Sequence, residues 1–420
     1  MACRLRRPRA LLTLPFLAIA FAAPGLATAE RMPGLPDAIE EPVYGLVGGR
    51  SAYGGSAGIT AGVATAEQIS TARAGGAKWL LSVQGKDGGW GAGSRGAEDP
   101  NAPSDVATTA MSALALMRDG GGVDVHRDAI ARAANFVARS VLDSAGDSPR
   151  IKGPTNTQPQ YKLGALVDTH LAALMLGELV GQLDDATNVV VNQAHDKVLG
   201  KVQMAQKADG SFDGEGWAPV LSSSIAASSL VQAQAMGKEV APEVMERSAR
   251  YEAGKVAGGS FDASAGAGVE LYSVATTLRG NSQAKAQAGT PAELKAAEDA
   301  EQAAAQRVAA DADGRLMAGF GSAGGEEMLS YMMISDTLVE TGGDAWTKWN
   351  GKVGGYLVST QNADGSWAGH HCITSRTFVT ASAMMSLGAE NGLALRAARS
   401  QPASDSATAA FSPDPGHELR

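Results

Sequence analysis

The sequence has 420 residues, with 35 lysines and arginines against 44 aspartates and glutamates, giving a formal net charge of −9. This acidic balance argues against nucleic acid and against an anionic membrane surface as partners. The length allows one large repeat domain or two ordinary domains.

Residues 1–29 have the pattern of a secretory signal peptide. Four arginines within the first nine residues precede an apolar run at 11–23, and Ala27 and Ala29 frame an A-x-A cleavage site. An uncleaved membrane anchor is the less favoured alternative. We therefore expect an exported protein, periplasmic or extracellular, whose mature chain does not span a membrane. Cys372 is the one cysteine after this segment, so core packing and not an internal disulfide must hold the fold.

The chain from residue 66 to residue 393 alternates helix-like segments with Gly-rich breaks. It follows a Gly/Pro-rich arm at 30–65 and precedes a Ser/Ala/Pro-rich tail at 394–420, which we expect to be disordered. The predicted helices form six pairs: 66–83 with 104–117, 125–142 with 166–180, 193–206 with 222–236, 242–253 with 270–278, 291–310 with 326–341, and 345–360 with 375–385. Small residues concentrate in the second helix of each pair. This favours an inner ring of second helices surrounded by an outer ring of first helices.

One seven-residue phrase occurs three times, each time after the first helix of a pair. It consists of Gln, three residues, Gly, one residue and an aromatic, and its copies are Gln84/Gly88/Trp90, Gln206/Gly210/Phe212 and Gln361/Gly365/Trp367. The Gln amide can satisfy loose helix carbonyls, the Gly can take a positive φ, and the aromatic can cover the turn. We therefore predict a structural role for these nine residues.

The repeated phrases resemble the QW motif of the prenyltransferase and squalene-cyclase repeat family, with degenerate versions at Phe261 and Phe320. The resemblance covers about residues 66–393. It implies an all-α fold, an α/α toroid of about six helical hairpins, in which the inner helices line a central cavity. That cavity is expected to bind an apolar or extended ligand, such as a lipid, an isoprenoid or a peptide-like segment. A protein partner is a further option.

The motifs that carry the chemistry of related enzymes are missing. The Asp-x-Asp-Asp acid motif of class II terpene cyclases is absent, and so is the Asp-x-Cys spacing of zinc-binding prenyltransferase subunits. Complement-type thioester domains need Cys and Gln three residues apart, whereas Ser375 occupies that place after Cys372. We therefore expect a binding protein without terpene cyclase activity.

Polar residues at the starts of the second helices are expected to face the mouth of the cavity, where helix N-termini gather. The predicted ligand-binding residues are Asp105, Glu270, Tyr272, Tyr331 and Arg376, and the candidate catalytic residues are Asp168, His170 and Cys372. Asp168 and His170 would act as an acid/base pair. Helix capping is the alternative explanation for Ser104, Asp168 and Ser375.

The cluster His370-His371-Cys372 suggests a metal. Imidazole and thiolate suit zinc or copper, and Asp168 or His170 could complete a tetrahedral site. This supports an alternative function, a zinc-type transferase or cyclase-like enzyme that uses residues 370–372. A Cys–His nucleophilic pair is another interpretation, and a turn with two exposed histidines and a buried thiol is a third.

Overall fold

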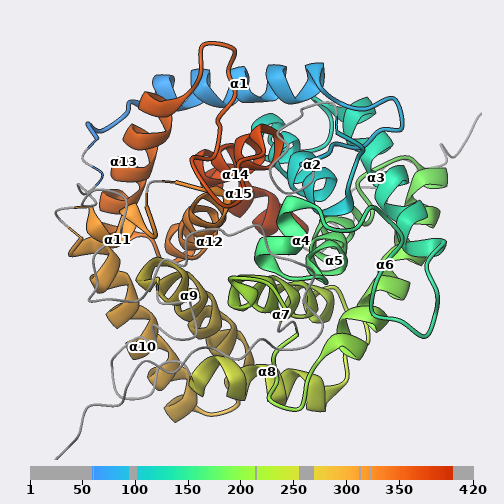
Figure 1. Cartoon of the computed structure of the whole chain (residues 1–420). Coiled ribbons are helices and arrows are strands. Elements are labelled where there is room, and N and C mark those ends of the chain that lie inside the picture. The colour runs from blue at the N-terminus through green and yellow to red at the C-terminus, as the bar shows by residue number, and fades with distance from the viewer. Residues whose placement is uncertain are drawn as a thin grey trace, which may run out of the picture. The chain divides into compact units, whose positions relative to one another are not determined.

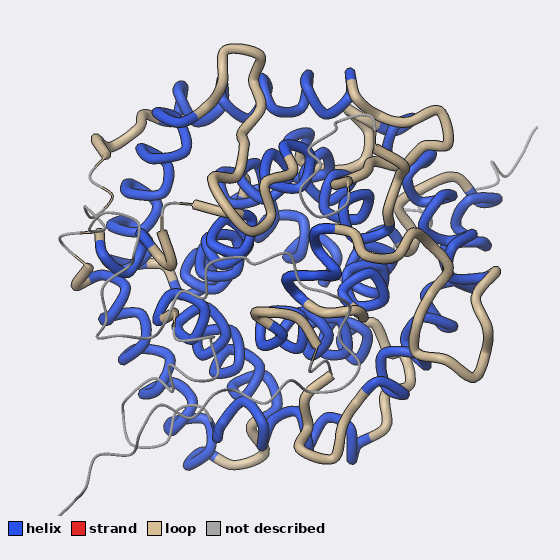
Figure 2. Tube along the Cα trace, in the orientation of Figure 1, coloured by secondary structure: helices blue, strands red, loops and turns tan. Residues whose placement is uncertain are grey.

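The computed structural model describes Ile59 and residues 61–93, 102–212, 215–254, 269–311, 314–321 and 323–400. The chain divides into Met1–Arg50 and Ser51–Arg420, and all of these residues belong to the second unit. They form fifteen helices and no β-strand (Figure 2). The predicted all-α class is confirmed. The predicted signal peptide and most of the predicted N-terminal arm lie outside the described residues.

Six helices form an inner ring, in which each packs against the next and the last packs against the first (Figure 1). In order they are α2 (Val106–Gly120), α5 (Val167–Leu179), α7 (Pro219–Ala235), α9 (Glu270–Gln287), α12 (Gly325–Thr341) and α14 (Arg376–Leu387). These are the second helices of the predicted pairs. They are buried on almost every side: α2 is buried without a break from Val106 to Arg118. Small side chains permit this close packing on several sides at once.

The first helices of the pairs lie outside this ring (Figure 1). They are α1 (Ala66–Ser82), α3 (Arg127–Leu142), α6 (Asp185–Ala205), α8 (Pro242–Gly254), α10 (Pro291–Ala309) and α13 (Gly343–Thr360). Each packs against the inner helix that precedes it around the ring, so α1 packs against α14. The described part of the chain therefore contains the six predicted hairpins.

Three helices were not predicted: α4 (Gln158–Leu163), α11 (Arg315–Ala318) and α15 (Ala389–Ser400). Helix α4 begins at a capping box between Thr157 and Gln160, inside a segment whose Pro and Gln content hides its helical character. Helix α15 packs against α2, α12 and α14. The helical region thus continues past residue 393, where the sequence placed its end.

Each glutamine of the repeated phrase joins two outer helices. Its Nε2 donates to the carbonyl of the phrase glycine and to a carbonyl of the next outer helix. The pairs of acceptors are Gly88 and Ala129 for Gln84, Gly210 and Val244 for Gln206, and Gly365 and Ala72 for Gln361. The third copy connects α13 to α1 and so closes the outer ring.

The aromatic residue of the phrase connects the outer and inner helices of its own hairpin. The indole Nε1 of Trp367 donates to the carbonyl of Leu357 in α13 at 2.7 Å, and its backbone N–H donates to Thr380 Oγ1 in α14 at 2.9 Å. Trp90 makes the equivalent bonds to Leu80 and Thr109. These bonds fit the structural role predicted for the repeated residues.

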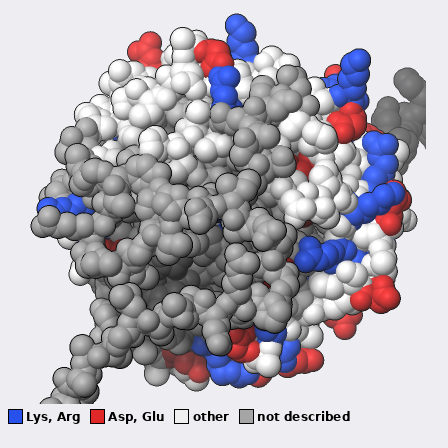
Figure 3. All heavy atoms as spheres, viewed as in Figure 1, with Lys and Arg blue, Asp and Glu red and all other residues white. Residues whose placement is uncertain are grey.

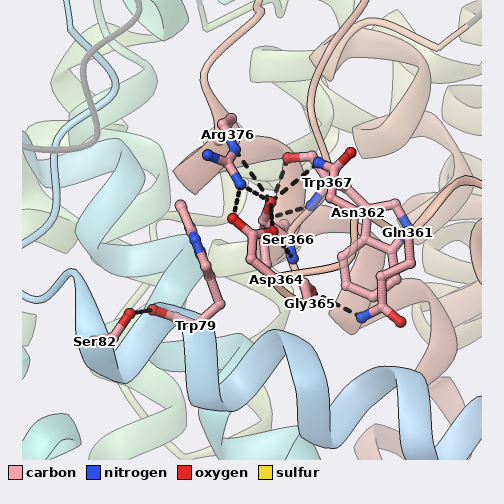
Figure 4. Close-up of polar contacts among 10 residues, drawn as sticks. Trp79, Ser82, Gln361, Asn362, Asp364, Gly365, Ser366, Trp367 and Arg376 are labelled. Atoms are coloured by element: carbon pink, nitrogen blue, oxygen red, sulfur yellow. Dashed lines mark hydrogen bonds and ion pairs between the residues drawn. The ribbon is translucent and has the colours of Figure 1, made fainter.

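The turn of the third copy shows why its fifth residue is Gly (Figure 4). Gly365 has a φ of +91°, and a Cβ there would lie 2.4 Å from the carbonyl oxygen of Gly75 in α1. We expect Gly365→Ala to lower the free energy of unfolding by more than about 1–2 kcal/mol, because strain at positive φ adds to the clash with α1.

Two control variants separate these causes in urea denaturation. Gly237 also has a positive φ, +72°, but nothing lies within 4 Å of a Cβ built there. Gly200 has neither constraint. We expect Gly237→Ala to cost less than Gly365→Ala, and Gly200→Ala to be neutral or stabilising. Equal costs at Gly365 and Gly237 would show that the contact with α1 is unimportant.

No helix among the described residues is long and apolar enough to cross a membrane. On the face shown in Figure 3, acidic and basic side chains are interspersed around the edge.

Candidate functional site

At the N-terminal end of the inner ring, Asp105 and Asp168 bind backbone amides. The Asp105 carboxylate caps α2 by accepting from the N–H of Thr108 at 2.8 Å, and it also accepts from the N–H of Ala92 at 2.8 Å. Asp168 accepts from the N–H of Ala107 at 2.8 Å, and so connects α5 to α2. Burial, with Asp168 nearby, raises the pKa of Asp105 to about 7. These contacts give both carboxyl groups a structural role. The capping alternative does not hold at Ser104 or Asp168, because Asp105 caps α2 and α5 follows Leu166 without a side-chain cap.

His170 is fully buried, and among the described residues it forms no metal-binding group with the predicted ligands. Its Nδ1 is 2.8 Å from Ser222 Oγ, and its ring packs edge-on against Phe212. Burial lowers the pKa of His170 to about 3, so the imidazole is neutral at physiological pH. Asp168 therefore does not form an acid/base pair with a charged His170.

A second acidic pair, Glu326 and Glu327 at the start of α12, lies against His371 and Cys372, which follow the third phrase. His371 Nε2 lies 3.3 Å from an oxygen of Glu327, and the His371 ring packs against Phe320. The pKa of the Cys372 thiol is raised to about 12. Burial is the largest cause, and the negative charge of the nearby Glu326 carboxyl is the next. Cys372 is therefore a thiol at physiological pH, whereas a cysteine nucleophile must be a thiolate.

The predicted metal ligands do not converge. No group of three or more His, Cys, Asp or Glu side chains in the described part of the chain is arranged to hold a metal ion. The backbone N–H of His370 donates to the Ala323 carbonyl, and the His370 ring packs against that of His371. Zinc or copper binding at residues 370–372 stays a prediction.

Glu326, at the start of α12, is a buried acid with an incomplete set of partners. Its Oε2 accepts from the backbone N–H of Ile373 at 3.3 Å, while its Oε1 is buried without a hydrogen-bond partner among the described residues. Burial, and secondly the Glu327 carboxyl, raise the pKa of Glu326 from 4.5 to about 7.

Glu326 should make the protein less stable as the pH rises. Between about pH 4.5 and pH 7 the unfolded chain loses this proton while the folded protein keeps it, so the free energy of unfolding falls by about 3 kcal/mol. We expect Glu326→Gln to remove this part of the pH dependence, since the amide keeps an acceptor for Ile373. Urea denaturation across this pH range measures it, with the exposed Glu298→Gln as control. If the free energy of unfolding of Glu326→Gln fell with pH as steeply as that of the wild type, Glu326 would not be the group responsible.

The other predicted ligand-binding residues make structural contacts. Glu270 accepts two hydrogen bonds from Arg307, at 2.7 and 2.8 Å. Tyr272 is buried in the core. The Tyr331 hydroxyl donates to the Met317 carbonyl.

Arg376 lies at the repeated phrase, beside Asp364 and Ser366 (Figure 4). Its guanidinium pairs with Asp364, donates to Ser366 and lies 5.1 Å from the centre of the Trp79 ring. This contact joins α14 to α1. Ser375 caps α14, as the capping alternative predicted.

A cavity of about 650 Å³ lies at the other end of the inner ring. All six inner helices and α15 contribute to its wall, each inner helix through its C-terminal half. None of the predicted catalytic, ligand-binding or metal residues is among the described residues that line it. Its apolar lining includes Leu114, Leu174, Val231, Met385 and Leu395.

The polar part of the cavity wall consists largely of arginines and acids. Its charged residues are Arg118, Arg279, Arg396, Arg399, Glu178, Asp336 and Glu340. Three ion pairs join them: Arg118 with Asp336 at 2.7 Å, Arg396 with Glu340 at 3.0 Å, and Arg399 with Glu178 at 2.5 Å. Arginine at this end is favourable because the inner helices point their negative C-termini toward it.

The sequence carried a signal for this site. Arg118 ends a buried run of small and apolar residues in α2, and Arg279 interrupts such a run in the middle of α9. A charge within such a run is rarely buried without a partner. The predicted site lay instead among polar residues at the starts of the inner helices, and a disordered tail was predicted from residue 394, within α15.

The comparison with curated proteins gives one partial match. No protein-family model matches the chain. A segment of 94 residues is 36% identical to drimenyl diphosphate synthase of Streptantibioticus cattleyicolor. This segment makes up 22% of this chain and 15% of that protein. The chain thus matches less than a sixth of the relative's length. This distant similarity to a terpene synthase, together with the all-helical structure, fits a terpenoid cyclase-like fold.

Proposed function

We propose that this protein binds an apolar ligand of terpenoid size in the cavity at the C-terminal end of the inner ring, without cyclising it. The observation that carries the proposal is the cavity itself, with its volume of about 650 Å³ and a wall built by all six inner helices. Ligand pockets occupy roughly 300–1,000 Å³ and combine an apolar lining with a few polar groups. The terpenoid class is suggested by the partial similarity to drimenyl diphosphate synthase.

We propose that the ligand is not cyclised because the described cavity wall offers no acid suited to start the reaction. The sequence lacks the Asp-x-Asp-Asp acid motif. The charged groups of the cavity wall are arginines and carboxylates held in ion pairs with them, and such a pair keeps a carboxylate ionised and unable to supply a proton. We further propose that the protein acts after export, as its N-terminal segment predicts.

Binding of farnesol to the purified protein, measured by calorimetry, tests the function. We expect farnesol to bind the wild-type protein and to lose its binding in Val231→Trp, because the indole fills the cavity. The matched control is Val189→Trp, since Val189 is exposed on α6. Absence of binding to the wild-type protein, or equal binding to both variants, would refute the proposal. Conversion of farnesyl diphosphate to a cyclic product would refute its non-catalytic part.

A further inference from the structure

The cavity wall holds one more positive charge than negative charges. It has four arginines and three acids, and each acid is used by one of the three ion pairs. The Asp336 carboxylate is occupied by Arg118 through two bonds, at 2.7 and 2.9 Å. The remaining cation is Arg279.

Arg279 has no ion pair with any described residue, and its Nη1 is buried without a hydrogen-bond partner among them. A buried guanidinium nitrogen without a hydrogen-bond partner is costly, because the protein does not replace the hydrogen bonds that water would make. The arginine comes from α9 and borders the same cavity as the apolar residues Leu114, Val231 and Leu395. A ligand with a hydrocarbon part and one anionic group would match both surfaces.

We propose that the ligand of this cavity is a monoanionic amphiphile whose carboxylate binds Arg279. The inference rests on the proposed function and adds the chemical class and the orientation of the ligand. A carboxylate accepts two parallel hydrogen bonds from a guanidinium. It also neutralises the single excess charge, whereas a doubly charged phosphate would leave the buried site with an excess negative charge. The hydrocarbon part then lies against the apolar side chains of α2, α7 and α15.

The test compares three ligands of equal hydrocarbon structure: farnesoic acid, farnesol and farnesyl monophosphate. Calorimetry at neutral pH gives their affinities for the wild-type protein and for Arg279→Met, with Arg250→Met as a matched surface control. We expect the acid to bind the wild-type protein at least about tenfold more tightly than the alcohol, because hydrogen bonds between two charged groups are stronger than those to a neutral hydroxyl. Arg279→Met should abolish this preference and leave farnesol binding within about threefold, and Arg250→Met should change neither.

The outcomes separate the inference from the function on which it rests. Binding of the acid and the alcohol with equal affinity would overturn the carboxylate assignment and leave the proposed function intact, whereas binding of neither would overturn the proposed function. Tighter, Arg279-dependent binding of the phosphate would replace carboxylate with phosphate as the class. If Arg279→Met lowers stability and leaves the acid-to-alcohol ratio unchanged, Arg279 only balances the helix C-termini and the inference fails. If Arg279→Met does not fold, the acid-to-alcohol affinity ratio is measured on Arg279→Lys instead. We expect a smaller preference for the acid in that variant than in the wild type.

Discussion

Replacing Trp367 with alanine is expected to lower the free energy of unfolding by about 3–5 kcal/mol, the usual cost of removing a buried tryptophan. The side chain is 1% exposed, and its indole N–H is bonded to the Leu357 carbonyl in the outer helix α13. The variant would leave a cavity between α13 and α14 and an unsatisfied carbonyl. Because the same turn connects α13 to α1, the loss falls where the outer ring closes.

Urea denaturation of Trp367→Ala and Trp217→Ala measures this effect. Trp217 is 46% exposed and serves as the matched control, with an expected cost below about 1 kcal/mol. A similar small cost for both variants would contradict the structural role of the repeated phrase. Trp367→Phe should recover part of the stability, since it refills the space without restoring the indole hydrogen bond.

Breaking the ion pair between Arg118 and Asp336 is expected to cost a similar amount. Asp336→Leu leaves the Arg118 guanidinium buried without its carboxylate, and the loss of one partner of a buried pair costs about 3–5 kcal/mol. The pair joins α2 to α12, and Arg118 also donates to the Met385 carbonyl of α14 at 2.8 Å. The double variant Arg118→Met/Asp336→Leu removes both charges, so we expect it to be clearly more stable than Asp336→Leu.

The pH dependence gives an independent check on this pair. Although burial raises it, the Arg118 charge and the neighbouring arginines hold the pKa of Asp336 below its ordinary value of 3.8. The stabilisation is thus fully present above about pH 4 and is lost as the pH falls through the folded-state pKa. In acid denaturation, the free energy of unfolding of the double variant should not show the fall with decreasing pH that Asp336 causes in the wild type. Equal destabilisation in the single and double variants, or an unchanged acid limb, would show that the pair does not stabilise the ring.

The helical framework could be predicted from the sequence because its determinants are local. Twelve predicted segments correspond to the inner and outer helices, and the repeated phrase with Gln361 and Trp367 correctly indicated where hairpins turn. Errors arose where a cap decides the boundary. Helix α6 begins at Asp185 and not at residue 193, because Asp184 accepts from the N–H of Thr187 at 3.0 Å.

The cavity could not be predicted because its wall brings together residues that are far apart in the chain. Arg118 and Asp336 are separated by 218 positions, and Arg399 reaches Glu178 over 221 positions. The sequence showed polar residues at both ends of the inner helices, and nothing local distinguished capping residues such as Asp105 from residues that face a cavity. Helix α15 adds part of the wall, although its polar composition resembles that of a flexible tail.

A crystal structure of the protein with farnesoic acid is the most direct test of a ligand site at the C-terminal end of the inner ring. We predict ligand density inside the cavity, with the carboxylate within hydrogen-bonding distance of Arg279 and the hydrocarbon chain against Val231 and Leu395. Ligand density at the opposite end of the ring, beside Glu326 and Cys372, would contradict the proposed site. A cavity left unoccupied at saturating ligand would contradict it equally.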